Sequence, residues 1–421
     1  MKKNIKTIAT VIVAVLISMS IAACNSSKPV QNESEQPGES SPAPVEKSSQ
    51  SLSVSVPPAV PEEKRDIKLG IVAPLTGGSA QMGNMYLKGI LLAVDEINEK
   101  GGINGHKIVT VIEDDKGVPI DSVTATRKLI NDDKVDLFFG GLNSSNALAN
   151  KPIAEEEKVP MFTGGTVTAI VTLDGWVFRC AVSNELQAGL WGRYAVEGLG
   201  GKTIAFIHEE DSYGTELYEF ASEAMKELGV EPVIVETYKR DDSDYSAQLL
   251  KIRALNPDIV MIGGIGVESA RIARQARQLF TYDVKLTGSD LWGNPETLSL
   301  AGDAAEGVVY FAAYFSESSE SPVIREVWGN FLAKHGEPPT EHVARGYSGM
   351  MVIEEALSKM DLSNGVNPDE FRNQALATKA LETPLGTSWY DASTGELFHQ
   401  IAMYQYQNGK AVFLTTVKGE N

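Results

Sequence analysis

IKLGIVA (67–73), KIVTVIE (107–113) and VDLFF (135–139) decide the fold class of this chain. Each segment is short, apolar and rich in β-branched residues, as is typical of strands buried on both faces of a parallel sheet. Longer stretches with helical periodicity follow the first two, near 82–99 and 119–132. Strand and helix therefore alternate, and this alternation predicts doubly wound α/β layers.

The alternation continues through most of the chain. Further strands are predicted at 202–208, 230–236, 258–262 and 307–313, with helices at 145–158, 185–198, 212–228, 244–255 and 267–281. Two helical stretches, 322–335 and 341–360, then follow without a strand between them. The pattern ends in two strand-like segments, 397–405 and 411–416. There are too many strands for one compact sheet, so we expect two α/β lobes. Their ligand is expected beyond the carboxyl ends of the strands.

Composition excludes several classes of protein. Of the 421 residues, 43% are hydrophobic and 22% charged, which is ordinary for a globular protein. The net charge of −19 should repel nucleic acid, so we expect no nucleic-acid partner. The presence of only two cysteines excludes a disulfide scaffold and a multi-cysteine metal site.

The first 23 residues read as a secretory signal peptide. Three lysines precede an apolar run, 8–23, that is short for a membrane span. The run ends in Ile21-Ala22-Ala23-Cys24, which resembles a bacterial lipobox, where the cysteine is lipidated and becomes the mature N-terminus. The alternative is a plain signal peptide with a chance cysteine. We expect a protein anchored by lipid to the outer face of the cell membrane.

A linker of low hydrophobicity follows Cys24. The segment 24–66 is rich in Ser, Pro, Glu and Gln, and such a segment buries too little apolar surface to fold. As a coil its ends would lie roughly 35 Å apart. We interpret it as a disordered tether between the membrane and the globular part, 67–421.

No pattern predicts catalysis, a cofactor or a metal. Gly264-Ile265-Gly266 resembles a dinucleotide-binding turn, but Ser269 stands at the third glycine position. The five histidines are scattered without the spacing of metal ligands. Cys180 has no histidine nearby in sequence, so we expect a buried, inert thiol.

Two loops and one acidic residue carry binding chemistry. Ser144 and Ser145 follow a glycine-rich turn, where hydroxyls and the free N–H groups of a helix can bind an anion. Gly165 and Thr166 end a similar loop, which allows close backbone approach and supplies a hydroxyl. Asp290, at the end of a short strand, can hold an ammonium group. Plain capping and ordinary turns would explain these residues equally well.

Several longer stretches resemble the leucine/isoleucine/valine-binding protein family. They are INEKGGINGHKI (97–108), SSN after a glycine pair (140–146), EEDSYG (209–214), DSDYSAQLLKIRALNPDIV (242–260), ARQARQ (273–278) and PLGTSWYDASTGE (384–396). The members are extracytoplasmic substrate-binding proteins of ABC importers with the type I periplasmic-binding fold, and the resemblance covers about 67–415. It implies two lobes, 67–183 plus 314–400 and 184–313 plus 401–421, joined by hinge crossings near 183, 313 and 400, with the ligand in the interlobe cleft.

The resemblance also implies roles for the site residues. Ser144 matches the serine that takes the α-carboxylate of an amino acid, and Gly165 and Thr166 match the loop that touches its ammonium and carboxylate groups. Tyr213 matches the tyrosine that closes over the ligand, and Asp290 matches the acid paired with the ammonium.

The side-chain pocket departs from the family pattern. Met82 and Ile265 stand where the best-known members carry tyrosines, and Trp292 is expected to complete this pocket. The resemblance therefore implies a monomeric receptor that delivers a branched-chain or other apolar amino acid to an ABC permease, with leucine-type specificity left open. A receptor for a small amide, urea or aromatic acid, and a membrane-tethered sensory module, are the alternatives.

Overall fold

The computed structural model of the chain describes residues 64–240, 242–313, 315–317 and 319–417. The chain divides into two units, 1–61 and 62–421, and all of the described residues belong to the second. The predicted signal peptide, Cys24 and nearly all of the predicted tether lie outside them. Among the described residues, no helix combines the length and apolar character needed to cross a membrane.

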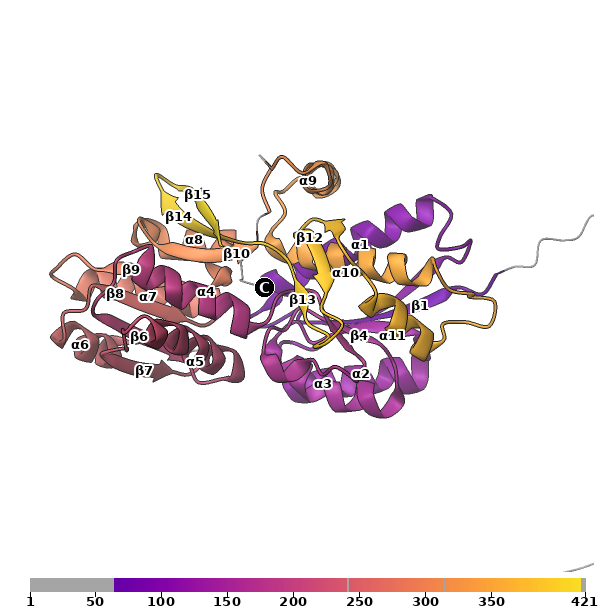
Figure 1. Cartoon of the computed structure of the whole chain (residues 1–421), viewed down its shortest axis with the longest axis horizontal. Helices are drawn as coiled ribbons and strands as arrows, with labels where there is room; N and C mark the ends of the chain where they lie inside the picture. Colours follow the sequence, from indigo (N-terminus) through magenta and orange to yellow (C-terminus); the bar gives the residue numbers. More distant parts are fainter. Residues whose placement is uncertain (1–63, 241, 314, 318, 418–421) are drawn as a thin grey trace, which may run out of the picture. The chain divides into compact units, whose positions relative to one another are not determined.

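A five-stranded parallel sheet forms the first lobe (Figure 1). Its strands, in spatial order, are β2 (Ile108–Asp114), β1 (Ile67–Ala73), β3 (Leu137–Gly140), β4 (Met161–Thr163) and β5 (Val177–Arg179). Helices α1 (Ala80–Glu99) and α10 (Glu341–Leu357) pack together on one side, and α2 (Pro119–Lys128) and α3 (Ser144–Glu157) on the other. Because both faces are covered, every residue of β3, β4 and β5 is buried.

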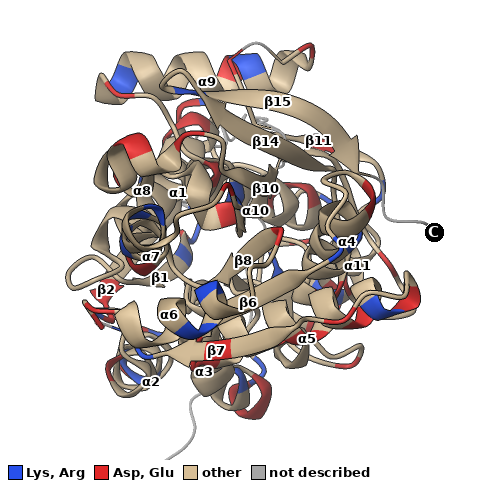
Figure 2. Ribbon diagram, turned by 90° about the vertical axis from the view of Figure 1, so that its left-hand side faces the viewer, with Lys and Arg blue, Asp and Glu red and all other residues tan. Residues whose placement is uncertain are grey.

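A seven-stranded mixed sheet forms the second lobe, which faces the viewer in Figure 2. In spatial order its strands are β15 (Lys410–Val417), β14 (Ile401–Gln407), β10 (Val309–Ala313), β9 (Lys285–Gly288), β8 (Ile259–Gly263), β6 (Ile204–Glu209) and β7 (Ile234–Tyr238). The five strands from β10 to β7 are parallel, and β14 and β15 are antiparallel additions. Its helices are α4 (Asn184–Glu197), α5 (Ser212–Glu227), α6 (Ser246–Ala254), α7 (Gly266–Leu279) and α8 (Pro295–Ala301).

The remaining elements belong to the first lobe or lie beside it. They are α9 (Pro322–His335), α11 (Pro368–Leu376) and a small antiparallel sheet of β11 (Leu381–Thr383), β12 (Gly386–Tyr390) and β13 (Leu397–Phe398). The chain passes between the two large sheets after β5, after β10 and between β13 and β14. The exact residues predicted for the lobe boundaries and for the three crossings remain predictions.

One prediction of secondary structure is wrong in detail. The segment 397–405 was expected to be one strand, but β13 and β14 are separate strands in different sheets. The break falls at His399 and Gln400, where the backbone carbonyl of Gln400 bonds the His399 ring. Lys64 and Arg65, which the sequence analysis assigned to the tether, contact the first lobe, since Arg65 pairs with Asp136 at 2.8 Å.

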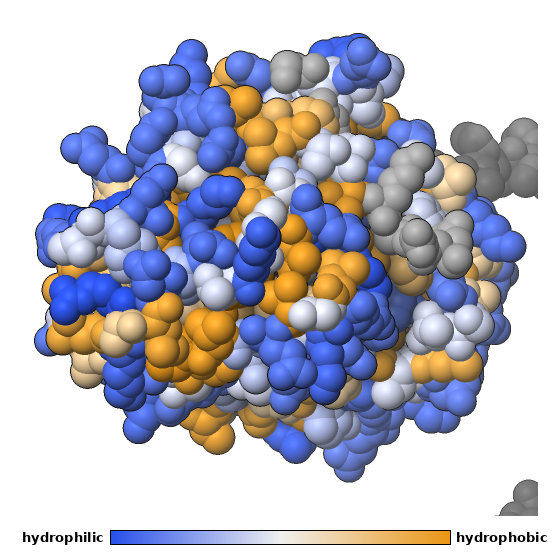
Figure 3. Space-filling model, turned by 60° about the vertical axis from the view of Figure 1, so that its left-hand side comes forward, coloured by the Kyte–Doolittle hydropathy of each residue, from blue (hydrophilic) through white to orange (hydrophobic). Residues whose placement is uncertain are grey.

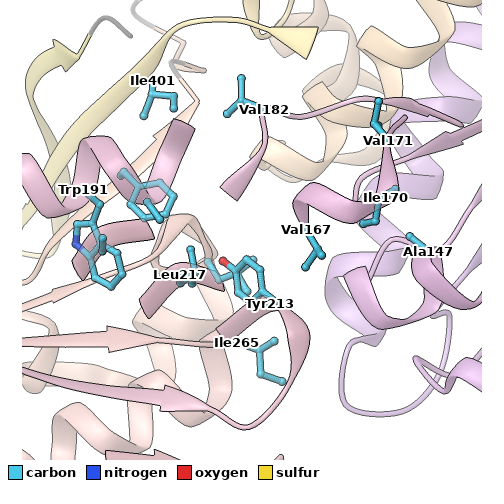
Figure 4. Packing of buried hydrophobic residues seen from close by; sticks show 14 of the residues in the cluster. Ala147, Val167, Ile170, Val171, Val182, Trp191, Tyr213, Leu217, Ile265 and Ile401 are labelled. Carbon is cyan, nitrogen blue, oxygen red and sulfur yellow. The ribbon is translucent and has the colours of Figure 1, made fainter. Parts of the chain in front are cut away.

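One apolar cluster extends from the core of the first lobe into the core of the second (Figure 4). Ala147 and Ile170 come from the first lobe, whereas Trp191, Leu217 and Ile265 come from the second. All five are buried. On the outer surface, by contrast, hydrophilic and hydrophobic residues are interspersed on the face that Figure 3 presents.

Candidate binding site in the interlobe cleft

A cavity lies between the lobes, and its empty space is about 410 Å³ when its opening to solvent is included. The first lobe contributes Met82, Leu142, Asn143, Ser144, Gly164, Thr166, His342 and Arg345, and the second contributes Asp211, Tyr213, Arg240, Ile265, Asp290 and Leu291. Most of these residues follow the carboxyl ends of parallel strands, where such sheets bind ligands.

The N-terminus of α3 forms one polar wall of the cavity. Helix α3 begins at Ser144, and the Asn143 side chain makes no capping hydrogen bond. The backbone N–H groups of Thr166 and Val167 donate to the Ser144 hydroxyl oxygen at 3.1 and 3.4 Å. Because these bonds use the oxygen only as an acceptor, the Ser144 hydroxyl hydrogen is left to donate to a ligand. Together with the helix terminus it suits an anion.

The glycine loop after β4 forms the adjacent wall, one residue away from the predicted register. Gly164 and Thr166 line the cavity, but Gly165 does not. The Gly165 carbonyl instead accepts a hydrogen bond at 3.0 Å from Arg179, which is fully buried. Arg179 also bonds the carbonyl of Val167 at 3.0 Å and so holds the loop from behind.

Arg179 is neutralised by Glu396. Its Nε and Nη2 atoms lie 2.9 and 3.0 Å from the two carboxylate oxygens of Glu396, a bidentate pair. Planar two-point pairing of this kind fixes orientation as well as charge. The loop that carries Gly164 and Thr166 is therefore positioned by an ion pair that the sequence analysis did not identify.

The opposite wall contains a charged network that joins the lobes. The Tyr213 hydroxyl donates to Asp290 Oδ1 at 2.6 Å, and Arg345 Nη2 donates to Asp290 Oδ2 at 2.5 Å. Arg345 also pairs with Glu341, one turn earlier on α10. All of Tyr213, Asp290 and Arg345 are buried.

The network holds one cation between two carboxyl groups. Burial, together with the charge of Asp290, raises the pKa of Glu341, although Arg345 lowers it. Burial acts to lower the pKa of Arg345, but Glu341 and Asp290 outweigh it and raise that pKa above its ordinary value. With both acids ionised, the three groups carry a net charge of −1, which leaves the network able to accept one further cation.

The other predicted site residues are divided between the cavity and its surroundings. Met82 and Ile265 line it, as Tyr213, Thr166 and Asp290 do. Ser145 is on the first turn of α3 but does not line the cavity. Trp292 is fully buried in the core of the second lobe, where its indole packs against Gly288. Trp292 therefore supports the fold around Asp290 and is absent from the cavity wall.

His342 lines the cavity and was missed by the sequence analysis. It is 2% exposed, and within the described residues neither ring nitrogen has a hydrogen-bond partner. Burial, with the nearby charge of Arg345, lowers its pKa well below the ordinary value, so the ring is neutral and can both donate and accept. His342 and Arg345 are three residues apart on α10, a spacing that places them on one helix face.

A second ion-pair network lies at the rim of the cavity in the second lobe. Arg240 Nε pairs with Glu209 at 2.6 Å, and Arg240 Nη2 pairs with Asp211 at 3.1 Å. Burial raises the pKa of Glu209 to about 7, and Asp211 and Glu268 add to this, whereas Arg240 opposes it. Asp211 also caps α5 by accepting from the N–H of Gly214.

The thiol of Cys180 is buried, as predicted. Burial raises its pKa to about 12, so it is protonated at neutral pH and is a poor nucleophile. In the described ranges, no group of three or more His, Cys, Asp and Glu side chains could hold a metal ion.

Comparison with known proteins identifies the family. The family model described as "Periplasmic binding protein" matches residues 66–411. The leucine-, isoleucine-, valine-, threonine- and alanine-binding protein of Pseudomonas aeruginosa is 29% identical over 327 residues, which cover 77% of this chain and 86% of the relative. The leucine-specific-binding protein of Salmonella typhimurium is 31% identical over 296 residues, which cover 70% of this chain and 79% of the relative.

Solved structures agree with this assignment. The leucine-binding protein LivK of Thermotoga maritima superposes with a TM-score of 0.77 at 27% identity, covering 83% of this chain and 98% of that one. LivJ of Streptococcus pneumoniae, solved with isoleucine, superposes with a TM-score of 0.77 at 25% identity, and the match covers 84% of this chain and 100% of LivJ. A solute-binding protein of R. palustris, solved with benzoate, shares the fold with a TM-score of 0.75 at 21% identity. The match covers 83% of this chain and 96% of that protein. The chain thus belongs to the periplasmic binding protein family and has its type I fold, with two α/β lobes.

Proposed function

We propose that this protein is the extracytoplasmic receptor of an ABC importer and that it binds an amino acid between its lobes. The observation that carries the proposal is that an anion site at Ser144 and an acidic network at Asp290 line the same cavity. A buried α-amino acid is a zwitterion and needs both kinds of site a few ångströms apart. The relatives named for leucine, isoleucine and valine support the same ligand class.

The carboxylate of the ligand is assigned to Ser144. It would accept hydrogen bonds from the Ser144 hydroxyl and from N–H groups at the start of α3, with Thr166 alongside. The ammonium is assigned to Asp290 and the Gly164 carbonyl. Arg345 donates to both of these acceptors, at 2.5 and 3.5 Å, so both lie next to its guanidinium, and the ammonium would bind beside that group.

The side chain of the ligand is assigned to the apolar part of the cavity. Met82 and Leu142 from the first lobe face Ile265 and Leu291 from the second. Apolar walls favour an apolar side chain by the area that they remove from water. His342, with two unpartnered ring nitrogens among the described residues, is available for a polar contact with the ligand.

A receptor for a carboxylic acid without an ammonium group is the second candidate. The observation that favours it is that Arg345 already supplies Asp290 with a cation. Calorimetric titration separates the two candidates: an amino-acid receptor binds leucine, isoleucine or valine much more tightly than the matching 2-oxo acids, benzoate and small amides. Tighter binding of the 2-oxo acid or of benzoate would establish the second candidate instead.

The N-terminal assignments form part of the same proposal. Lipidation at Cys24 would tether the receptor to the outer face of the cell membrane, beside the permease that receives the ligand. We expect the receptor to act as a monomer, and a sensory module with the same anchor is the remaining alternative. Loss of amino-acid uptake on deletion of the gene distinguishes transport from sensing, because a sensor would leave uptake intact.

A further inference from the structure

A second cavity adjoins the first within the interlobe cleft, and its empty space is about 340 Å³ when its opening to solvent is included. It is lined by Gly78, Ser79, Gln81, Met82, Ile265, Gly266, Val267, Leu291, Asn294, Glu296 and Thr297. Three of these residues, Met82, Ile265 and Leu291, line both cavities. The two spaces are therefore separated by a wall only one layer of side chains thick.

The wall is apolar, and one of its members can move. Ile265 and Leu291 are buried, whereas Met82 is only half-buried. Methionine is unbranched and has three rotatable side-chain bonds, so it adapts to its surroundings more easily than isoleucine. The backbone beside it is closely packed, because a Cβ atom at Gly83 would lie 2.0 Å from the Pro74 carbonyl oxygen. A passage would open by rotation of the Met82 side chain.

The second cavity is polar and has an acidic character. Beyond the shared wall it presents hydroxyl and amide groups from Ser79, Gln81 and Asn294, and its lining contains one charged residue, Glu296. Glu296 is exposed, so its charge is screened but available. These groups suit an amide or an ammonium and disfavour a carboxylate.

We propose that the second cavity is a subsite for long, linear side chains that end in an amide or ammonium group. The inference rests on the proposed amino-acid receptor and extends its ligand class. The α-carbon groups would stay at Ser144 and Asp290, the methylenes would lie against Met82, Ile265 and Leu291, and the polar end would reach Asn294 and Glu296. An aliphatic stem with a polar tip matches an apolar passage that opens into a polar space.

The test is calorimetric titration of the full chain with lysine, glutamine, leucine and valine. Gln81 lines the second cavity but not the first. Gln81→Trp fills the second cavity and should weaken lysine and glutamine at least tenfold, while leucine and valine change by less than about threefold. Gln81→Met, which nearly conserves volume, is the matched control and should retain all four ligands. Glu296→Gln should weaken lysine alone, by up to about fivefold, as for an exposed ion pair. Melting curves establish that each variant is folded, and Gln81→Phe replaces Gln81→Trp if the larger ring prevents folding.

The outcomes separate this inference from the proposed function. If wild type binds leucine but neither lysine nor glutamine, the subsite is refuted and the amino-acid receptor stands. If Gln81→Trp weakens leucine as much as lysine, or weakens neither, the long side chain does not use the second cavity, and the inference is again wrong. If no amino acid binds wild type, the proposed function fails, and the subsite fails with it.

Discussion

The guanidinium of Arg345 reaches across the interlobe cleft and lies 2.5 Å from the carboxylate of Asp290. The same nitrogen also pairs with Glu341, so one arginine is shared between two acids. The acid expected to receive the ammonium of a ligand is thus already part of a charged cluster. A carboxylate oxygen can accept more than one hydrogen bond, and with both acids ionised the cluster carries an excess negative charge. A cationic group of the ligand would complete it.

The first prediction concerns Asp290. Asp290→Asn should weaken amino-acid binding at least about 30-fold, since removing one member of a desolvated charge pair costs about 2–5 kcal/mol. The matching 2-oxo acid, which has no ammonium, should be affected much less. Asp303→Asn changes an exposed acid of the same lobe and is the control for both titrations. Equal amino-acid affinity in Asp290→Asn and wild type would remove Asp290 from the ammonium site.

The second prediction concerns Ser144. Ser144→Ala should lower affinity by about fivefold, equivalent to about 1 kcal/mol, because the helix N–H groups remain to bind the carboxylate. Ser145→Ala removes a hydroxyl from the same helix turn, outside the cavity lining, and should change affinity by less than about twofold. If titration gives the reverse order, the carboxylate is not bound at Ser144.

The third prediction concerns the membrane anchor. Cys24→Ser should release the protein from the membrane fraction and abolish incorporation of labelled fatty acid, because the thiol is the acceptor of the lipid. Cys180→Ser is the matched control, since that thiol is buried in the globular part and should leave labelling unchanged. Persistent membrane attachment of Cys24→Ser would contradict lipidation at this position.

The parallel strands were predictable because a strand that is buried on both faces is a continuous run of apolar residues. All residues of β6 and β8, for example, are buried; β8 is continuously apolar, and β6 is apolar from Ile204 to Ile207. By contrast, β4 and β5 are three residues each, too short for a periodic signal, and were missed. The helix that became α10 was predicted, but not which of its faces lines the cleft.

A site residue was predictable only where its position depends on the local geometry of its own loop. Ser144 and Thr166 follow strand ends, so their placement depends on local geometry. Arg345 and His342 act through contacts with elements distant in sequence, and no local pattern reveals such packing. Trp292 was assigned to the cavity because it follows Asp290, yet side chains so close in sequence can point in different directions.

The fourth prediction concerns the ion pair that positions the glycine loop. Glu396→Gln should lower the free energy of unfolding by about 3 kcal/mol, because it leaves the guanidinium of Arg179 buried without a countercharge. This figure is the lower end of the usual range, since Glu396 is partly exposed. Urea denaturation measures it, and ligand affinity should fall as well because the loop carries Thr166.

The exposed pair of Lys88 and Glu337 provides the control for this measurement. Glu337→Gln should change stability by less than about 0.5 kcal/mol, as for most surface substitutions. Comparable losses in Glu396→Gln and Glu337→Gln would show that the pair of Arg179 and Glu396 contributes no more than a surface contact.

The fifth prediction concerns pH and Glu209, whose pKa is raised from 4.5 to about 7 by burial and by Asp211. Between these two values the native state keeps the proton of Glu209 while the unfolded chain loses it. The unfolded state then binds fewer protons, so the free energy of unfolding falls as pH rises through this window. Glu209 should therefore cost up to about 3 kcal/mol of stability at pH 7 relative to pH 4.

Glu209→Gln removes the titration but keeps an acceptor for Arg240, so its stability advantage over wild type should grow from pH 4 to pH 7. Denaturation curves across this range measure the difference, and Glu210→Gln, at the adjacent exposed acid, should run parallel to wild type. If Glu209→Gln also runs parallel to wild type, Glu209 does not take up a proton on folding.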